Sequence, residues 1–214
     1  MYFKLFASQS KAMKHIPRAI VCLALFACAA LSFDQGPTDK AAASDKVIDH
    51  IRQADLLNHL LPILWTKGQL NAILPSIEKA RQTVELAHDN EYHKLMELDP
   101  KVSAAVDKAL NDGNLPGRDL LKGVNDQLNT LQVTRTILGK RNEGLVYDAL
   151  TATLNSGQKK AMANDLDPSS VTPGLKVETM SDEEKIRFYI RNILLDPLTY
   201  DLLVKLQRSP AIQG

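Results

Sequence analysis

Two stretches of the chain, WTKGQ at residues 65–69 and LNSGQ at residues 154–158, follow one pattern. Each has an apolar residue, then a residue that commonly caps helices, then two spacers and a glutamine. A Thr or Asn at the N-cap accepts a hydrogen bond from the third backbone N–H of the helix, and Gln at that third position reaches back to the N–H of the cap. The two stretches therefore predict two helix starts, each closed by a capping box.

The capping residues are Thr66 and Asn155, and the returning side chains belong to Gln69 and Gln158. Trp65 precedes the first cap, where a large apolar side chain can form a hydrophobic staple with the helix that follows. A capping box defines a helix start and by itself gives no function.

Apolar residues elsewhere recur every three or four positions, and no run of β-branched residues alternates with period two. This predicts an all-α fold, an elongated bundle or hairpin of long amphipathic helices followed by a C-terminal helical hairpin. The expected order is a signal peptide (1–32), a flexible linker (33–44), a helical domain (45–164), a loop (165–180) and the C-terminal hairpin (181–208).

Caps, prolines and glycines predict where the helices of the first half begin and end. A first helix is expected to start at Ser44 and to end or bend at Pro62, and a kink is expected at Pro75. The dipeptide Asp99-Pro100 is typical of a helix start, which predicts a separate short helix ending near Gly113.

A long helix is expected from Pro116 to about Thr153, with a break near Gly139. Its apolar positions follow the alternating three- and four-residue spacing of a bundle face. Arg135 and Asn142 interrupt that face. They either set the register of the helix against its neighbour or mark a groove that accepts a partner.

The N-terminal segment 1–32 has the order of parts of a secretory signal, with cations first and an apolar run after them. The run from 19 to 31 is shorter than the roughly 20 residues of a membrane span, and an uncleaved N-terminal anchor is the alternative. The residues LFAC at 25–28 resemble a lipobox that would make Cys28 the lipidated first residue, whereas Ala27-Cys28-Ala29 fits ordinary signal peptidase.

Removal of 1–32 takes away four of the 26 Lys and Arg and none of the 25 Asp and Glu, which leaves 22 − 25 = −3. Nucleic-acid-binding domains usually carry a basic excess, so nucleic acid is not an expected partner. Both cysteines, Cys22 and Cys28, lie in the signal segment, and the mature chain therefore has no disulfide. No nucleophile elbow, HExxH motif or phosphate loop is present, so neither an enzyme nor a cofactor is expected.

In an exported helical chain, the two stretches resemble degenerate copies of the LTxxQ motif of the periplasmic family that includes Spy and CpxP. Trp65 stands where the first motif has Leu, Leu154 matches, and Asn155 replaces Thr. The resemblance covers roughly residues 45 to 165 and implies a non-enzymatic helical chaperone or stress protein of the periplasm or cell envelope. Its implied partners are unfolded or envelope proteins bound on an apolar helical surface.

Three readings of the function remain open at this point. The first is the chaperone, for which a homodimer pairing the apolar stripes is the expected assembly and the membrane is reached only through a lipid anchor. The second is a structural or interaction lipoprotein without chaperone activity. The third is a metal-binding stress sensor, for which His93 and Glu97, one helical turn apart, are weak candidate ligands, and two neighbours on one helix do not complete a site.

Overall fold

The computed structural model describes residues 39–210 and residue 212, and every regular element in that part of the chain is a helix. The chain divides into two units, residues 1–48 and 49–214. Helix α2 (Asp39–Leu60) crosses the boundary between them. The predicted signal peptide and Cys28 lie outside the described residues.

Helix α2 begins at Asp39, so the prediction of a flexible linker extending to Ser44 was wrong. The sequence DKAAAS contains three alanines, the best helix former, and has no Gly or Pro that would stop a helix before the predicted cap. A short 3-10 helix, η2 (Leu61–Ile63), follows α2 and contains Pro62, where the end of the helix was predicted.

Helix α3 (Lys67–Asp112) is continuous through both Pro75 and Pro100, and a separate helix starting at residue 99 does not exist. The Asp99 carboxylate, which was predicted to cap that helix, instead accepts a hydrogen bond from the Ser103 hydroxyl at 3.4 Å. Gly113 ends α3 with φ +66°, the left-handed conformation predicted for it.

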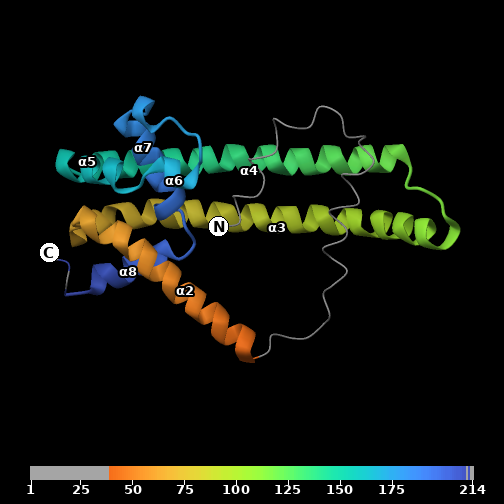
Figure 1. Ribbon diagram of the computed structural model, residues 1–214, viewed down its shortest axis with the longest axis horizontal. Coiled ribbons are helices and arrows are strands. Elements are labelled where there is room, and N and C mark those ends of the chain that lie inside the picture. Colours follow the sequence, from red (N-terminus) through yellow and green to blue (C-terminus); the bar gives the residue numbers. More distant parts are fainter. Residues whose placement is uncertain (1–38, 211, 213–214) are drawn as a thin grey trace. The chain divides into compact units, whose positions relative to one another are not determined.

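Helix α4 (Arg118–Thr153) runs without the break expected near Gly139. A Cβ at this glycine would meet no atom within 4 Å, so the residue lies on an open part of the helix surface. Its cost of about 1 kcal/mol relative to Ala did not interrupt a helix of 36 residues. Figure 1 shows α3 and α4 side by side as an antiparallel hairpin.

The remaining elements follow α4 directly. They are α5 (Ser156–Asp165), α6 (Pro168–Val171), the 3-10 helix η3 (Val177–Thr179), α7 (Asp182–Tyr189), the π-helix η4 (Ile190–Leu194) and α8 (Thr199–Arg208). The segment 165–180, predicted as a loop, therefore contains two short helical turns. The last helix begins at Thr199, because Asp196 caps the preceding turn by accepting from the Leu198 N–H at 2.9 Å.

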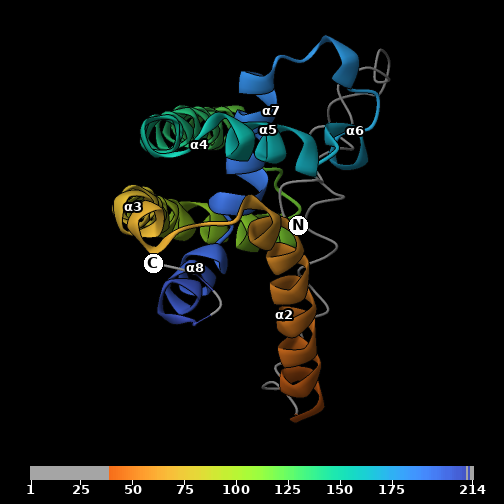
Figure 2. The ribbon, with the colours of Figure 1, turned by 90° about the vertical axis from the view of Figure 1, so that its left-hand side faces the viewer.

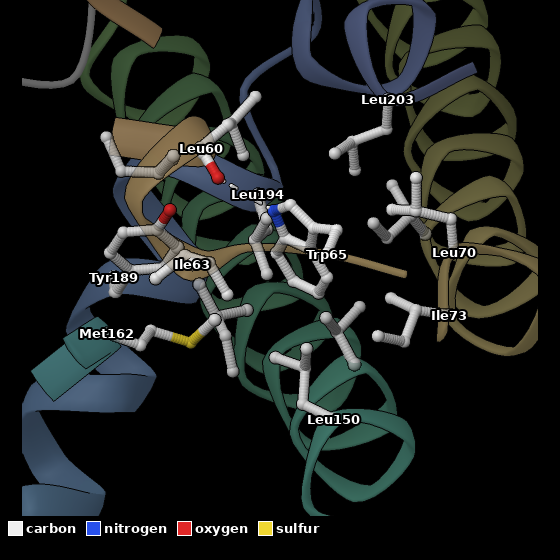
Figure 3. Packing of buried hydrophobic residues seen from close by; sticks show 14 of the residues in the cluster. Leu60, Ile63, Trp65, Leu70, Ile73, Leu150, Met162, Tyr189, Leu194 and Leu203 are labelled. Atoms are coloured by element: carbon white, nitrogen blue, oxygen red, sulfur yellow. Dashed lines mark hydrogen bonds between the residues drawn. The ribbon is translucent and has the colours of Figure 1, made fainter. Parts of the chain in front are cut away.

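The core gathers around Trp65, whose indole Nε1 donates to the Leu60 carbonyl at 2.9 Å (Figure 3). Tyr189, Leu194 and Leu203 of the C-terminal region are fully buried in the same cluster. The predicted C-terminal hairpin is therefore part of the single core of the second unit and not a module added to it.

The helices that follow α4 gather at one end of the α3–α4 hairpin, where α3 begins and α4 ends (Figure 1). Figure 2, which looks from that end, shows α5 and α7 beside α4, and α8 beside α3. The other end of the hairpin has none of these helices against it. None of the helices between residues 39 and 210 combines the length and the apolar character that a membrane crossing requires.

Candidate functional site

Both predicted capping boxes are formed. Thr66 Oγ1 accepts from the Gln69 N–H at 3.2 Å, and Gln69 Oε1 accepts from the Thr66 N–H at 3.0 Å. At the second motif, Asn155 Oδ1 accepts from the Gln158 N–H at 2.9 Å, and Gln158 Oε1 accepts from the Asn155 N–H at 3.2 Å. Each glutamine amide is thereby oriented by the helix that it caps.

The fold then brings the two glutamines together. Gln69 Nε2 donates to Gln158 Oε1 at 2.8 Å, and Gln158 Nε2 donates to Gln69 Oε1 at 3.0 Å. A primary amide has one oxygen that accepts twice and two N–H donors, so this pairing uses one acceptor site and one donor of each amide. Residues 89 positions apart are joined by their only functional groups.

The remaining amide donors bind the backbone that enters the opposite motif. Gln69 Nε2 donates to the Thr153 carbonyl at 3.2 Å, and Gln158 Nε2 reaches the Leu64 and Ile63 carbonyls, each at 3.1 Å. Thr153 and Leu64 each lie two residues before the cap of their own motif. The two motifs are therefore related by an approximate two-fold arrangement, which we call the motif junction (residues 63–69 and 153–158).

The apolar residue of each motif anchors the junction to the core. Trp65 is 4% exposed and Leu154 is 5% exposed. Leu64 has φ +55°, which a non-glycine residue adopts at a cost of roughly 1–2 kcal/mol. In this conformation the Leu64 carbonyl accepts a hydrogen bond from Gln158 Nε2, so a tertiary contact holds the backbone at Leu64.

Sequence analysis found the capping boxes but missed the contact between them. Both motifs carry a glycine immediately before the glutamine, but this shared feature concerns each cap and not the contact between the motifs. A Cβ at Gly157 would lie 3.3 Å from Asn155 Oδ1, tighter than most real contacts, and one at Gly68 would lie 3.9 Å from Thr66 Oγ1. The shared glycine leaves room for the capping side chain at the second motif.

The two polar interruptions of the α4 face both bind α3. Asn142, 3% exposed, donates from Nδ2 to the Ala80 carbonyl at 3.1 Å, and its Oδ1 accepts from the Thr83 hydroxyl at 3.4 Å. Arg135 pairs with Glu91 through two hydrogen bonds of 2.7 and 2.5 Å. These contacts fix the register of α4 against α3, as one of the two readings of these residues proposed.

The ion pair of Arg135 with Glu91 also shifts the pKa of the Glu91 carboxyl. The Arg135 guanidinium, by hydrogen bonding to Glu91, lowers the pKa of that carboxyl from its usual value, while burial opposes the shift. Glu91 is 6% exposed and its partner is more than half exposed, so the ion pair is open to water on one side.

A second carboxylate of α4, Glu143, lies against α7 and η4. It is 7% exposed and faces two arginines, Arg187 at 3.4 Å and Arg191 at 3.2 Å. The contact of Arg191 with Oε2 is ionic, because that oxygen accepts no hydrogen bond. Arg187 also stacks on Tyr147, with 4.0 Å from the guanidinium carbon to the ring centroid. This cluster attaches the C-terminal helices to α4.

Helix α2 is attached by three polar contacts of its own. His59 Nδ1 lies 2.6 Å from a carboxylate oxygen of Asp165, and the Tyr189 hydroxyl donates to the His59 carbonyl at 2.8 Å. Burial raises the pKa of Tyr189, so this hydroxyl stays protonated and can donate. Arg52 Nη2 reaches Asp196 at 3.1 Å. These contacts hold α2 against α5, α7 and the turn before α8.

The candidate metal ligands His93 and Glu97 do not acquire further ligands from the fold. Among the described residues, no group of three His, Cys, Asp or Glu side chains converges well enough to hold a metal ion. The His93 ring makes an edge contact with the Tyr92 ring, with 5.6 Å between the ring centroids.

The far half of the hairpin carries a different kind of feature. A row of large apolar side chains there is 37–59% exposed, and we call this row the open face. Its members are Val84, Tyr92, Leu95 and Met96 of α3, and Leu121 and Leu128 of α4. Leu131 is the single buried apolar residue between positions 81 and 145, all of which the structure describes.

The open face continues the face of the hairpin that the C-terminal half of the chain covers. Positions 18 residues apart lie on one line of an α-helix, because 18 residues make five turns. Leu74 is 7% exposed, whereas Tyr92, five turns later, is 59% exposed. Val146 of α4 is 0% exposed, whereas Leu128, five turns earlier, is 47% exposed. The same apolar line is thus buried at one end of the hairpin and uncovered at the other.

No protein-family model matches the chain, and no curated protein or solved structure is significantly similar to it. The candidate site therefore has to be judged on its own geometry. It consists of a hydrogen-bonded motif junction at one end of the hairpin and an uncovered apolar face at the other.

The pairing of the two glutamines predicts energetic coupling between distant motifs. Gln69→Ala and Gln158→Ala should each lower the free energy of unfolding by about 1–3 kcal/mol, because each leaves buried or half-buried polar groups without partners. The double variant should lose less than the sum, by about 1 kcal/mol, because the two residues share one interaction. Urea denaturation followed by circular dichroism measures the natural protein, the two single variants and the double variant.

Glu184→Ala is the matched control, since Glu184 occupies the same position in the Ser181 capping box without a tertiary contact. Additive losses at Gln69 and Gln158 would contradict the pairing.

The Glu91–Arg135 pair predicts a stability difference that depends on pH. Glu91 has a lowered pKa in the folded protein, so its contribution is present above the unfolded value of about 4.3 and is lost as the pH falls through the folded value. Glu91→Gln should cost about 1–2 kcal/mol near pH 7, and the difference from the natural protein should shrink toward about pH 3. Glu85→Gln, which removes a looser contact of 3.9 Å with Arg81, should have little effect at either pH. A loss at Glu91 of equal size at both pH values would show that packing, not charge, is responsible.

Proposed function

We propose that this protein is a non-enzymatic helical binding protein of the cell envelope, with chaperone-like capture of unfolded or partner proteins on the open face. The single observation that supports this most is the exposure of Tyr92 and Leu95, which lie five turns along α3 from the buried Leu74 and Ile77. Large contiguous apolar patches are uncommon on soluble monomers and commonly mark interaction sites.

The construction of the hairpin supports the same proposal. Its far half holds one buried apolar residue, Leu131, and the ion pair of Glu91 with Arg135. Two helices alone cover little of each other's apolar surface, so a third helical or extended segment on the open face would complete a core there. The near end, held by the motif junction and the C-terminal helices, provides a rigid base from which this surface is presented.

The resemblance of the two motifs to LTxxQ adds to the proposal, since periplasmic proteins of that family act without catalysis. The described part of the chain offers no converging metal ligands, which gives the metal-sensor alternative no geometric support. Two alternatives remain. One is a homodimer that pairs two open faces, and the other is a structural lipoprotein tethered by Cys28.

Export through the N-terminal segment predicts a shortened mature chain. Intact-mass measurement of the protein purified from its envelope fraction should show loss of about the first 30 residues. A diacylglycerol-modified cysteine at the new N-terminus would identify Cys28 as a lipid anchor. An unmodified chain that begins at residue 30 or later would identify ordinary cleavage. A full-length mass in the soluble fraction would contradict export.

The open face predicts suppression of aggregation. The purified protein should reduce light scattering by a chemically denatured model protein at a near-stoichiometric ratio. Tyr92→Ser with Met96→Ser removes apolar surface from the open face, and severalfold more of this variant should be needed. Leu86→Ser with Ile137→Ser is the matched control, because these two residues are 62% and 63% exposed and lie on the other side of the hairpin. No suppression by the natural protein at large excess would favour a structural lipoprotein.

A further inference from the structure

Most acidic residues along the far half of α3 lie on one side of the helix, and Glu97, which lies among the lysines, is the exception. Four acidic residues lie on the same edge as the outer side chains of the open face, at successive steps of three or four residues. The edge reads Glu85, Asp89, Tyr92, Met96, Asp99, Ser103 and Asp107, and we call it the acidic edge. Residues at such spacing share one side of a helix.

The lysines of the same segment lie elsewhere. Lys94, Lys101 and Lys108 recur every seven residues, so they form one line along α3, and Glu97 lies beside this line between the first two. Each step of one residue turns an α-helix by about 100°, and Lys94 and Lys101 follow Tyr92 and Asp99 by two residues, so this line lies roughly opposite the acidic edge.

Helix α4 does not neutralise the acidic edge. From Arg118 to Arg141 its cations are Arg118, Lys122, Arg135, Lys140 and Arg141, and none of them forms an ion pair with a carboxylate of the acidic edge. Arg135 is already paired with Glu91. Asn125 and Gln132, which flank the line of Leu121 and Leu128, carry no charge.

We propose that the occupant of the open face is a cationic amphipathic helix of a partner protein, which lays its apolar side on the open face and its Lys or Arg residues along the acidic edge. This proposal rests on the proposed function and names its partner by chemistry. An amphipathic helix in an apolar groove is a recurring mode of recognition, and complementary charge at the rim selects among such helices.

The length of the acidic edge fits such a partner. Residues 85 to 107 extend about 33 Å at 1.5 Å per residue, which matches a helix of about 20 residues. Because the face continues the line that the C-terminal helices cover, a docked helix would extend the packing already present around Leu74 and Val146. A second copy of the chain fits less well, since pairing α3 with α3 would place two acidic edges together.

The test uses the full chain and two designed peptides of about 20 residues. Both have leucine on one helical side, and they differ only in carrying Lys or Glu on the other. Fluorescence anisotropy should show binding of the cationic peptide at least about tenfold tighter than that of the acidic peptide, with an affinity that falls as salt is added.

Two matched triple variants locate the contact. Asp89→Lys, Asp99→Lys and Asp107→Lys together reverse the acidic edge, and they should weaken binding of the cationic peptide about tenfold. Lys94→Glu, Lys101→Glu and Lys108→Glu together change as many charges on the opposite line and should not weaken it. All six positions are exposed, and thermal melts confirm that both variants fold.

The outcomes separate this proposal from the proposed function. Equal binding of both peptides, lost in the Tyr92→Ser and Met96→Ser variant, would overturn the charge selectivity and leave partner binding in place. Binding of neither peptide, together with no suppression of aggregation, would overturn both. Concentration-dependent self-association in sedimentation that the open-face variant abolishes and the cationic peptide does not displace would identify a second copy as the occupant instead.

Discussion

The mutual hydrogen bonding of Gln69 and Gln158 is the constraint on which the rest of the second unit depends. Each amide oxygen accepts from its own helix cap and from the other amide, and each amide nitrogen donates across the junction. The start of α3 and the start of α5 therefore cannot be positioned independently. Because Thr153 and Leu64 supply further acceptors, the chain entering each motif is held as well.

This junction determines what the long hairpin buries and what it exposes. It brings the end of α4 beside the start of α3, and the core around Trp65 and Leu194 forms at that end. Asn142 and Arg135 then carry the register outward along the hairpin through polar contacts with α3. The chain after α5 returns to the junction and packs there, so the covering helices never reach the far half.

In the far half of the hairpin, α3 and α4 are consequently left without a third helix packed against them. There the buried Glu91 pairs with the half-exposed Arg135 and keeps the two helices aligned. The helices bury little apolar surface against each other in this half. The apolar line outside that pair meets water, and its α3 side is bordered by acidic residues. The proposed binding role rests on this incompleteness, and the proposed cationic partner rests on the negative charge of that border.

The sequence alone determined the helical class, both capping boxes, the left-handed end of α3 at Gly113 and the C-terminal end of α4 at Thr153, because each depends on residues within a turn or two. It misplaced the start of α2, the helix expected at Asp99 and the break at Gly139, where local signals worth about 1–3 kcal/mol did not decide the outcome. Only the tertiary structure decided that the two glutamines meet, that the C-terminal helices belong to the core and that one apolar line is half covered. Those features depend on contacts between residues some 40 to 140 positions apart, and local spacing carries no information about which of two equivalent helical faces another helix will cover.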